Sequence, residues 1–439
     1  MSTTPSLRVA VLGAGTVGWP VVRAFLERPG KLAPFDGARL TLAGVADKYV
    51  DRVIARGVPA EIVTDAPAHL VADPGVDVIV ELMGGDEPAH TLVAASLAAG
   101  KAVVTANKHV IAHHGPELEA IAREHGGTFR FEAAVGGGIP VLSPIAADLA
   151  ANEVRQVRGI VNGTTNFILT SMHGHGSDFE DVLAEAQTRG YAEADPRGDV
   201  EGHDAVNKIV ILARLAFGAW LAPADVPMCP PTLHGAGLPG VTGVTAVEVA
   251  AAGALGLTLK LIALAEIGAD GRPTASVLPS AVDRDSYLGR THGVLNRIEV
   301  VADPVGTVAF SGPGAGGDAT SSAVLGDLIA FARGQGSTWA GLAPATKVRP
   351  RPAEDSAETA SGRFEPAGPL AGSRVWMAFL PGASVDLVRA TAGAAIDRAV
   401  AIAGGTVVRT GTLSLEQVRA ALLPVFPDGM DVTLYPVVD

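Results

Sequence analysis

Residues 190–208 read GYAEADPRGDVEGHDAVNK and place several carboxylates and one lysine directly before an apolar run. That run, residues 209–220, is apolar on nearly every side, so we expect a helix buried in a core. Asp204 and Lys208 lie four residues apart and share one face of this helix, while Asp199 is placed to cap its first turn. A lysine partly removed from water has a lowered pKa, which suits a proton-transfer catalyst near neutral pH.

The same Asp204 and Lys208 also fit an ordinary ion pair at the rim of a core helix. The preceding loop, however, supplies Glu193, Asp195 and Asp199. We expect these carboxylates to converge on Lys208. Such a concentration of acids around one lysine favours a catalytic site over an isolated pair.

A glycine-rich turn follows the first apolar segment of the chain. Residues 7–12 predict a strand and residues 19–27 a helix, with Gly13, Gly15 and Gly18 between them. In this spacing the first glycine makes a tight turn, the second lets the backbone approach a pyrophosphate, and the third allows close packing of helix on strand. The pattern predicts a dinucleotide-binding loop.

The end of the second predicted strand, residues 40–46, bears on the choice of cofactor. Asp47 favours NAD, since a carboxylate here can hold the adenosine ribose. Lys48 and Arg52 favour NADP, because a nearby cation accommodates a 2′-phosphate, although both also fit a solvated helix start. The sequence therefore leaves NAD and NADP as alternatives.

Strands at residues 76–82 and 102–105 alternate with helices at 88–99 and 115–125. Apolar strands that alternate with helices predict a Rossmann-type, doubly wound α/β domain.

Ligands of such a sheet bind beyond the carboxyl ends of its strands. Residues 105–108 (TANK) follow a strand, so we expect Lys108 to meet the nicotinamide or the substrate. His109, His113 and His114 come next, but neither Cys nor carboxylate stands at ligand spacing, and we expect no zinc site there.

Three further glycine-rich segments follow. Residues 132–140 (EAAVGGGIP) combine a glutamate with bare carbonyls, which can bind a hard cation. Residues 159–166 carry short polar side chains that fit helix capping or substrate contact. Residues 311–317 precede a predicted helix at 322–332, which we expect to pack on the first sheet.

The C-terminal part begins with a polar, proline-rich linker at residues 341–372. Beyond it we predict a small α+β domain; its strands span residues 375–380, 406–409 and 431–437, and its helices span 385–403 and 415–425.

Composition excludes several classes of protein. The chain has 439 residues, a net charge of −13 and only four Tyr and four Trp, which argues against a nucleic-acid partner. We expect no membrane span and no secretory signal, and hence a cytoplasmic protein. Cys229 is the sole cysteine, so there is no internal disulfide, and we expect it to be a small buried residue.

Six segments in sequence order carry a resemblance to a known family: GAGTVG, TANK, EAAVGGGIP, GIVNGTTNFILT, GYAEADPRGDVEGHDAVNK and GPGAGGDAT. Over residues 7–335 the chain resembles homoserine dehydrogenase. The resemblance implies NAD(P)-dependent interconversion of L-homoserine and L-aspartate 4-semialdehyde, in the biosynthesis of threonine, methionine and isoleucine. The physiological direction stays open.

The resemblance also implies roles for individual residues. Lys208 is the proton donor and acceptor on the substrate's C4 oxygen, and Lys108 polarises or positions that oxygen. Glu193 and Asp204 bind the substrate's ammonium end, and Asp199 supports the same network. With the glycine turn, the expected cofactor-binding residues are Gly13, Gly15, Thr16, Val17, Gly18, Asp47, Lys48, Thr105, Lys108, Gly190 and Gly316. A structural monovalent cation such as sodium is expected at the Glu132 side chain and the carbonyls of Val135, Gly137 and Ile139.

The expected organisation is a dinucleotide-binding domain at 1–140 and 306–340 and a catalytic and dimerisation domain at 141–305, followed by the linker at 341–372 and the α+β domain at 373–439. The last domain is similar to a regulatory ACT domain in its alternation of elements. We expect a homodimer or higher homo-oligomer.

Two other functions compete with this reading. An acylating semialdehyde dehydrogenase needs a cysteine nucleophile, and Cys229 lies outside every motif. A non-catalytic dinucleotide sensor is the main alternative, because a binding fold does not prove turnover.

Overall fold

The computed structural model describes residues 5–268, 270–347, 370, 372–426 and 429–438. The chain divides into two compact units. Unit 1 comprises Met1–Glu153, Arg214–Trp220 and Phe310–Lys347, and unit 2 comprises Val154–Ala213, Leu221–Ala309 and Val348–Asp439. Each unit is therefore assembled from segments that are far apart in sequence.

Unit 1 is built on a six-stranded parallel sheet with the order β3-β2-β1-β4-β5-β6. Its strands are β1 (Ser6–Leu12), β2 (Arg39–Ala46), β3 (Val63–Thr64), β4 (Val78–Glu81), β5 (Ala102–Thr105) and β6 (Thr128–Arg130). Buried β-branched residues fill β1, β4 and β5, as expected of parallel strands covered on both faces. This order is that of the doubly wound dinucleotide-binding fold, and the predicted fold class is confirmed.

The helices of unit 1 are α1 (Gly18–Glu27), α2 (Val50–Ala55), α3 (Pro67–Ala72), α4 (Ala89–Ala98), α5 (Lys108–His125), α6 (Leu142–Ala146) and α12 (Gly317–Ala332). The prediction started α5 at residue 115, but Asn107 caps it by accepting a hydrogen bond from the Val110 N–H at 3.3 Å. Pro116 lies inside this helix, so it did not mark the helix start. Val324 and Leu328 of α12 join the core beneath β1, which confirms the predicted packing of this helix.

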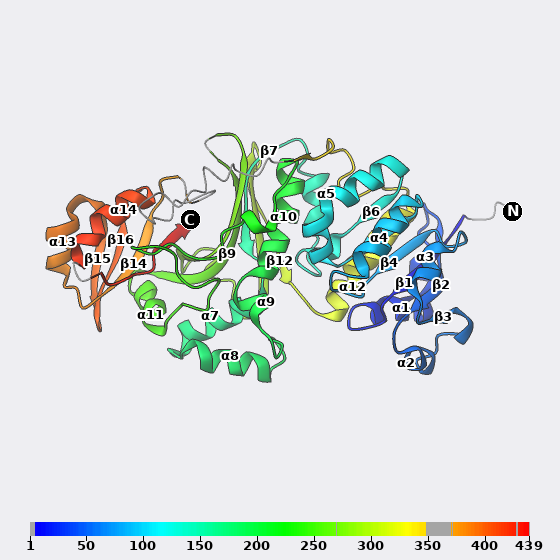
Figure 1. Cartoon of the computed structure of the whole chain (residues 1–439), viewed down its shortest axis with the longest axis horizontal. Helices are drawn as coiled ribbons and strands as arrows, with labels where there is room; N and C mark the ends of the chain where they lie inside the picture. The colour runs from blue at the N-terminus through cyan, green and yellow to red at the C-terminus, as the bar shows by residue number, and fades with distance from the viewer. Residues whose placement is uncertain (1–4, 269, 348–369, 371, 427–428, 439) are drawn as a thin grey trace. The chain divides into compact units, whose positions relative to one another are not determined.

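Unit 2 contains most of a nine-stranded sheet, with the order β12-β11-β7-β9-β10-β17-β14-β16-β15. Figure 1 labels β7, β9, β12, β14, β15 and β16 of this sheet. The strands of this sheet that precede residue 314 are β7 (Glu153–Ile160), β9 (Leu257–Ile267), β10 (Pro273–Asp283), β11 (Leu295–Asp303) and β12 (Gly306–Pro313). The helices are α7 (Gly163–His175), α8 (Phe179–Thr188), α9 (Arg197–Val200), α10 (His203–Phe217) and α11 (Ala246–Ala254). The capping box of α11, formed by Thr245 and Glu248, fixes where that helix begins.

The C-terminal region follows a β-α-β-β-α-β sequence: β14 (Trp376–Pro381), α13 (Val385–Ala392), β15 (Ile396–Ile402), β16 (Gly405–Thr410), α14 (Leu415–Leu422) and β17 (Tyr435–Val438). The strand order β17-β14-β16-β15 is that of a ferredoxin-like sheet. The last strand, β17, also pairs in parallel with β10 at Ala281 and Val437. The predicted α+β region is confirmed, and through β17 it continues the sheet of unit 2.

One predicted helix and one predicted linker need correction. The helix predicted at residues 385–403 ends at Ala392, and residues 396–402 form β15. Gly393 has a φ of 49° and ends the helix, and the alternating sequence IDRAVAI then suits a strand. Within the predicted linker, Thr346–Lys347 forms β13, which pairs with β8 (Ala219–Trp220). Residues 348–369 and 371 of that linker lie outside the described residues.

Among the residues that the structure describes, none of the helices combines the length and the apolar character needed to cross a bilayer.

Candidate active site

Lys208 lies on α10 in unit 2, and only 6% of its surface is exposed. Its Nζ donates hydrogen bonds to Asp204 Oδ2 and to the carbonyl of Val161, each at 2.6 Å. The predicted pair on one helix face is therefore confirmed. A side-chain carboxylate and a main-chain carbonyl together fix the position of the amine.

Asn162 links this pair to a second carboxylate. Its side-chain oxygen accepts from the Thr165 N–H at 2.9 Å and caps α7. Its Nδ2 donates to Asp199 Oδ1 at 2.7 Å and to Asp204 Oδ2 at 2.9 Å. The sequence indicated capping or substrate contact for residues 159–166, but it did not reveal that one amide joins two acids.

Asp199 does not cap α10 as predicted. It belongs to the short helix α9, and α10 begins only at His203. Its carboxylate accepts from Asn162 and from the Thr164 hydroxyl at 3.1 Å. Burial, and then repulsion from Asp204, raise the pKa of Asp199 above its usual range. The cluster thus holds Asp199 as an acid that burial and a neighbouring carboxylate make harder to ionise.

The other acids of the loop behave differently. Asp195 is exposed and forms an ion pair with Arg197 at 2.6 Å, whose hydrogen bonds lower the pKa of Asp195 to about 2. Glu193 is also exposed, and its carbonyl accepts from Gln187 at 3.1 Å. Of the three loop acids predicted to converge, Asp199 joins the cluster through Asn162, whereas Asp195 pairs with Arg197 instead and Glu193 is exposed. Gly190, at the end of α8, has a φ of 73°, a conformation that favours glycine.

In unit 1 the glycine turn has the geometry that its spacing predicts. Gly13 has a φ of 94°, and a Cβ on Gly18 would lie 1.8 Å from the Gly13 carbonyl oxygen, so Gly18 is required for packing. A Cβ on Gly15 would have no atom within 4 Å, which leaves open space at the position expected to meet a pyrophosphate. The loop after Gly316 lies close by, since a Cβ on Gly317 would be 2.4 Å from the Thr16 carbonyl oxygen.

Asp47 braces this turn from the end of β2. Its Oδ2 accepts from the Ala14 N–H and its Oδ1 from the Tyr49 N–H, both at 2.8 Å. The cations of Lys48 and Arg52 lie 4.9 and 4.8 Å from the centroid of the exposed Tyr49 ring. The carboxylate is thus engaged by the backbone and by Arg52, whose Nη2 lies 3.5 Å from Asp47 Oδ1.

The ends of β4 and β5 are joined by a carboxylate that the sequence analysis missed. Glu81 is fully buried; its Oε2 accepts from the Thr105 hydroxyl at 2.7 Å and its Oε1 from the Met83 N–H at 2.8 Å. The Thr105 hydroxyl in turn accepts from the Asn107 N–H at 2.9 Å, just before Lys108 begins α5. The sequence signal that could have identified Glu81 is a carboxylate at the end of an otherwise apolar strand.

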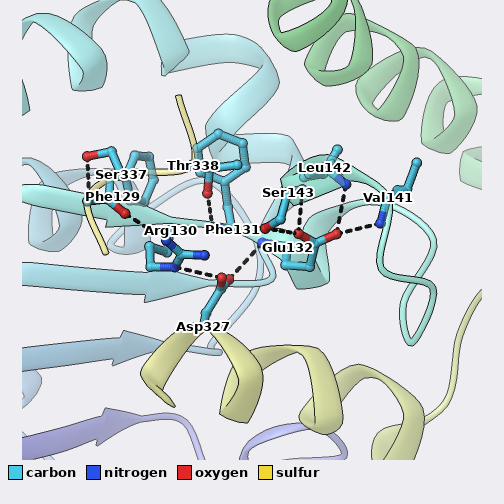
Figure 2. A network of polar contacts seen from close by, with 11 residues as sticks. Phe129, Arg130, Phe131, Glu132, Val141, Leu142, Ser143, Asp327, Ser337 and Thr338 are labelled. Carbon is cyan, nitrogen blue, oxygen red and sulfur yellow. Dashed lines mark hydrogen bonds and ion pairs between the residues drawn. The ribbon is translucent and has the colours of Figure 1, made fainter. Parts of the chain in front are cut away.

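Glu132 was expected to hold a cation through its side chain. Its Oε1 accepts from the N–H groups of Val141 and Leu142, and its Oε2 accepts from the N–H and the hydroxyl of Ser143, at 2.6–2.8 Å (Figure 2). A carboxylate offers about four lone-pair positions, so these four donors use its acceptor capacity. The carboxylate anchors the start of α6 and fits poorly as a cation ligand.

The backbone before Glu132 is fixed by a buried ion pair. Arg130 donates to Asp327 of α12 at 2.8 Å, and the second oxygen of Asp327 accepts from the Glu132 N–H at 2.8 Å (Figure 2). Burial raises the pKa of Asp327 to about 6. This network joins β6, α12 and the segment that leads to α6.

Gly15, with open space around it, and the braced turn at the carboxyl ends of β1 and β2 fit a bound dinucleotide. Two family models agree with this reading. Residues 13–132 match the NAD-binding domain of homoserine dehydrogenase, and residues 140–329 match the homoserine dehydrogenase model.

Individual proteins give the same result. A homoserine dehydrogenase from Synechocystis is 40% identical over 327 residues, which cover 74% of this chain and 73% of the relative. One from Mycobacterium tuberculosis is 43% identical over 329 residues, which cover 74% and 72%.

Solved structures extend the similarity to the C-terminal region. A homoserine dehydrogenase from Thiobacillus denitrificans matches with a TM-score of 0.86 and 29% identity, over 100% of both chains. A hyperthermophilic archaeal homoserine dehydrogenase in complex with NADPH matches with a TM-score of 0.60 and 26% identity, over 74% of this chain and 97% of that one. From its sequence and its fold, the chain belongs to the homoserine dehydrogenase family.

Proposed function

We propose that the chain catalyses the NAD(P)-dependent interconversion of L-homoserine and L-aspartate 4-semialdehyde. The observation that carries the proposal is the buried amine of Lys208, held by Asp204 and the Val161 carbonyl at 2.6 Å each. The dinucleotide, when bound, supplies the hydride chemistry. Lys208 takes the proton from the C4 hydroxyl when homoserine is oxidised and returns it when the aldehyde is reduced.

The remaining residues bind and orient the substrate. Asp204 and Glu193 attract its ammonium group, and Asp199 supports Asp204 through their shared partner Asn162. Lys108 begins α5 beyond the carboxyl end of β5, where the ligands of such sheets bind, and we assign it the positioning of the C4 oxygen.

We assign the cofactor preference to NADP. Asp47 already accepts two backbone N–H groups and pairs with Arg52 at 3.5 Å, which leaves this carboxylate little capacity for a ribose hydroxyl. Lys48 and Arg52 flank Tyr49 at the same strand end and can neutralise a 2′-phosphate. Changing both cations to Ala should raise the KM for NADP far more than the KM for NAD. An equal change in both values would contradict the assignment.

Three finer features rest on the resemblance. We place a structural monovalent cation at the carbonyls of Val135, Gly137 and Ile139, without the Glu132 carboxylate and without a part in the chemistry. We also propose a homodimer and the division into the domains 1–140 with 306–340, 141–305 and 373–439.

The last domain has the strand order of a ferredoxin-like module, and we propose that it binds a regulatory amino acid. Threonine is the candidate, and turnover that does not change across millimolar threonine would exclude it.

Lys208→Ala tests the catalytic assignment. We expect it to bind the dinucleotide normally and to lose 10²–10⁴-fold in kcat, about the contribution of a general acid–base group. Lys31→Ala, an exposed lysine in unit 1, is the matched control and should keep full activity. Turnover that survives in Lys208→Ala would refute the role of this lysine. A wild-type protein that binds the dinucleotide and turns over neither substrate would be a sensor instead.

A further inference from the structure

Helices α4 and α5 lie side by side in unit 1 (Figure 1). They carry a group of two imidazoles and a carboxylate. His90 comes from α4, and His114 and Glu117 come from α5. One potential ligand atom from each of these three residues lies within 4.8 Å of the other two. The proposed reaction does not use this group.

The distances approach those of a metal centre. His90 Nε2 lies 3.4 Å from Glu117 Oε2, close to the roughly 3.3 Å that separates neighbouring ligands of a tetrahedral zinc ion with bonds of about 2.0–2.2 Å. His90 Nε2 is also buried and has no hydrogen-bond partner among the described residues. An imidazole nitrogen of this kind can be satisfied by a metal ion.

A second layer of carboxylates orients both rings. His90 Nδ1 lies 3.2 Å from Glu87 Oε1, and His114 Nε2 lies 2.8 Å from Asp86 Oδ1. Metal-bound histidines usually donate their other ring N–H to a carboxylate in this way, which fixes the tautomer and makes the ligand more basic. Here each ring has such a partner through one nitrogen, and the second nitrogen of His90 is the one that faces Glu117.

We propose that His90, His114 and Glu117 bind a divalent ion of the zinc class, with water as the fourth ligand. Two imidazoles and one carboxylate suit zinc, and also cobalt and nickel, better than magnesium or calcium. The two rings are stacked, with centroids 3.8 Å apart and an angle of 14° between their planes. One ring must turn about its Cβ–Cγ bond for both nitrogens to face one ion, and the carboxylate partner of that ring, Asp86 or Glu87, must move with it to keep the outer contact.

The position of this centre links it to the residues beyond β4 and β5. Asp86 and Glu87 follow Gly85, whose carbonyl accepts from the side chain of Asn107 at 2.8 Å. Asn107 caps α5 immediately before Lys108. A bound ion would therefore hold together α4, α5 and the loop after β4, next to the lysine assigned to the substrate.

From the sequence, no zinc site was expected here, because no carboxylate was identified at ligand spacing. That expectation overlooked the spacing of His114 and Glu117, which are three residues apart and so share a face of α5. It also lacked Asp86, Glu87 and His90, which the fold brings from the neighbouring loop and helix.

Metal binding to the untagged, full-length protein tests the proposal. We expect one Zn²⁺ per chain by equilibrium dialysis, and Co²⁺ in its place should give the intense visible absorption of a four-coordinate site. His90→Ala and Glu117→Gln should each weaken the binding at least tenfold. Glu87→Gln should weaken it about 10- to 100-fold, as expected for an outer partner. His125→Ala, an exposed histidine at the end of the same helix, should bind like the wild type.

The dinucleotide affinity of each variant serves as the check that it is folded. Wild-type protein that binds no Zn²⁺ would overturn the proposal. So would binding that persists unchanged in a variant lacking both His90 and Glu117, because the ion would then lie elsewhere. Loss of binding in His125→Ala to the same degree would also contradict the assignment.

Discussion

Replacing Glu119 by Gln should destabilise unit 1 strongly while changing the size of the side chain very little. Glu119 lies on α5, and its carboxylate accepts from Arg214 Nε at 2.9 Å, from Arg214 Nη2 at 2.6 Å and from Trp220 Nε1 at 2.9 Å. The Arg214 side chain is fully buried, and the Glu119 side chain is 3% exposed. The variant therefore leaves a guanidinium inside the protein without its counter-charge.

Removing one partner of a buried ion pair costs about 3–5 kcal/mol, and we expect the free energy of unfolding to fall by this amount. The pH dependence adds a second test. Burial alone would raise the pKa of Glu119, but the hydrogen bonds from Arg214 and Trp220 outweigh it, and the pKa lies below its usual range. A lowered folded-state pKa means that the pair stabilises above about pH 4.5 and that this stability is lost as the pH falls through the folded-state pKa. Glu119→Gln should lack this acid-sensitive component.

Urea denaturation, followed by tryptophan fluorescence and far-UV circular dichroism, measures the effect. Arg123→Met is the matched control, because Arg123 binds the same carboxylate from a side chain that is 32% exposed, and its loss should cost about 1 kcal/mol or less. The double variant Glu119→Gln, Arg214→Met should lose less stability than the sum of the two single variants. A cost below about 1 kcal/mol for Glu119→Gln, or an equal cost for Arg123→Met, would refute the reasoning.

Three further predictions follow from the described contacts. Gly18→Ala should lower both stability and dinucleotide affinity, because its Cβ would clash with Gly13, whereas Gly15→Ala should unfold like the wild type and lose only affinity. Thermal melting measures the stability and cofactor titration the affinity. Equal effects of the two variants would argue against the assigned roles. Burial lowers the pKa of Lys260 to about 7, below its unfolded value. The free energy of unfolding should therefore decrease by at most about 5 kcal/mol as the pH falls from about 10.5 to 7, and then level off. Lys260→Met should flatten this slope in urea titrations, and an unchanged slope would show that Lys260 stays charged. Asn162→Ala should cost about 1 kcal/mol of stability, because α7 loses its cap. It should also raise the pKa of Asp199 further, which would shift the acid limb of the kcat/KM profile. An unshifted limb would show that Asp199 does not act in the site.

Local patterns predicted the main sheet of unit 1 and its glycine turn. The glycine spacing, the apolar strands and the acid at the end of β2 predicted the sheet, the turn and the place of the dinucleotide, because each depends on residues close in sequence. Lys208 and Asp204 were found for the same reason, since a helix brings residues four apart onto one face.

What the sequence could not supply are contacts between distant segments. Asn162 reaches Asp199 and Asp204 only after α7 and α10 have packed, and no spacing rule predicts that one amide serves two acids. The role of Glu132 depends likewise on donors at the start of α6. The strand β15 was missed because a helical prediction ran on past Gly393, where a φ of 49° breaks the helix.

The interleaving of the two units along the chain has a consequence for synthesis. Unit 1 needs α12, whose Val324 and Leu328 complete its core. In unit 2, β10 pairs with β17, which lies at residues 435–438, through Ala281–Val437 and Val282–Val438. A nascent chain that has emerged from the ribosome only as far as residue 300 therefore has an incomplete nucleotide-binding layer and an unpaired edge on β10, and unpaired edges invite association with other chains. Unit 1 can be completed only after residue 347 has emerged, and unit 2 only after residue 438, so the nascent polypeptide should depend on chaperones longer than its size alone would suggest.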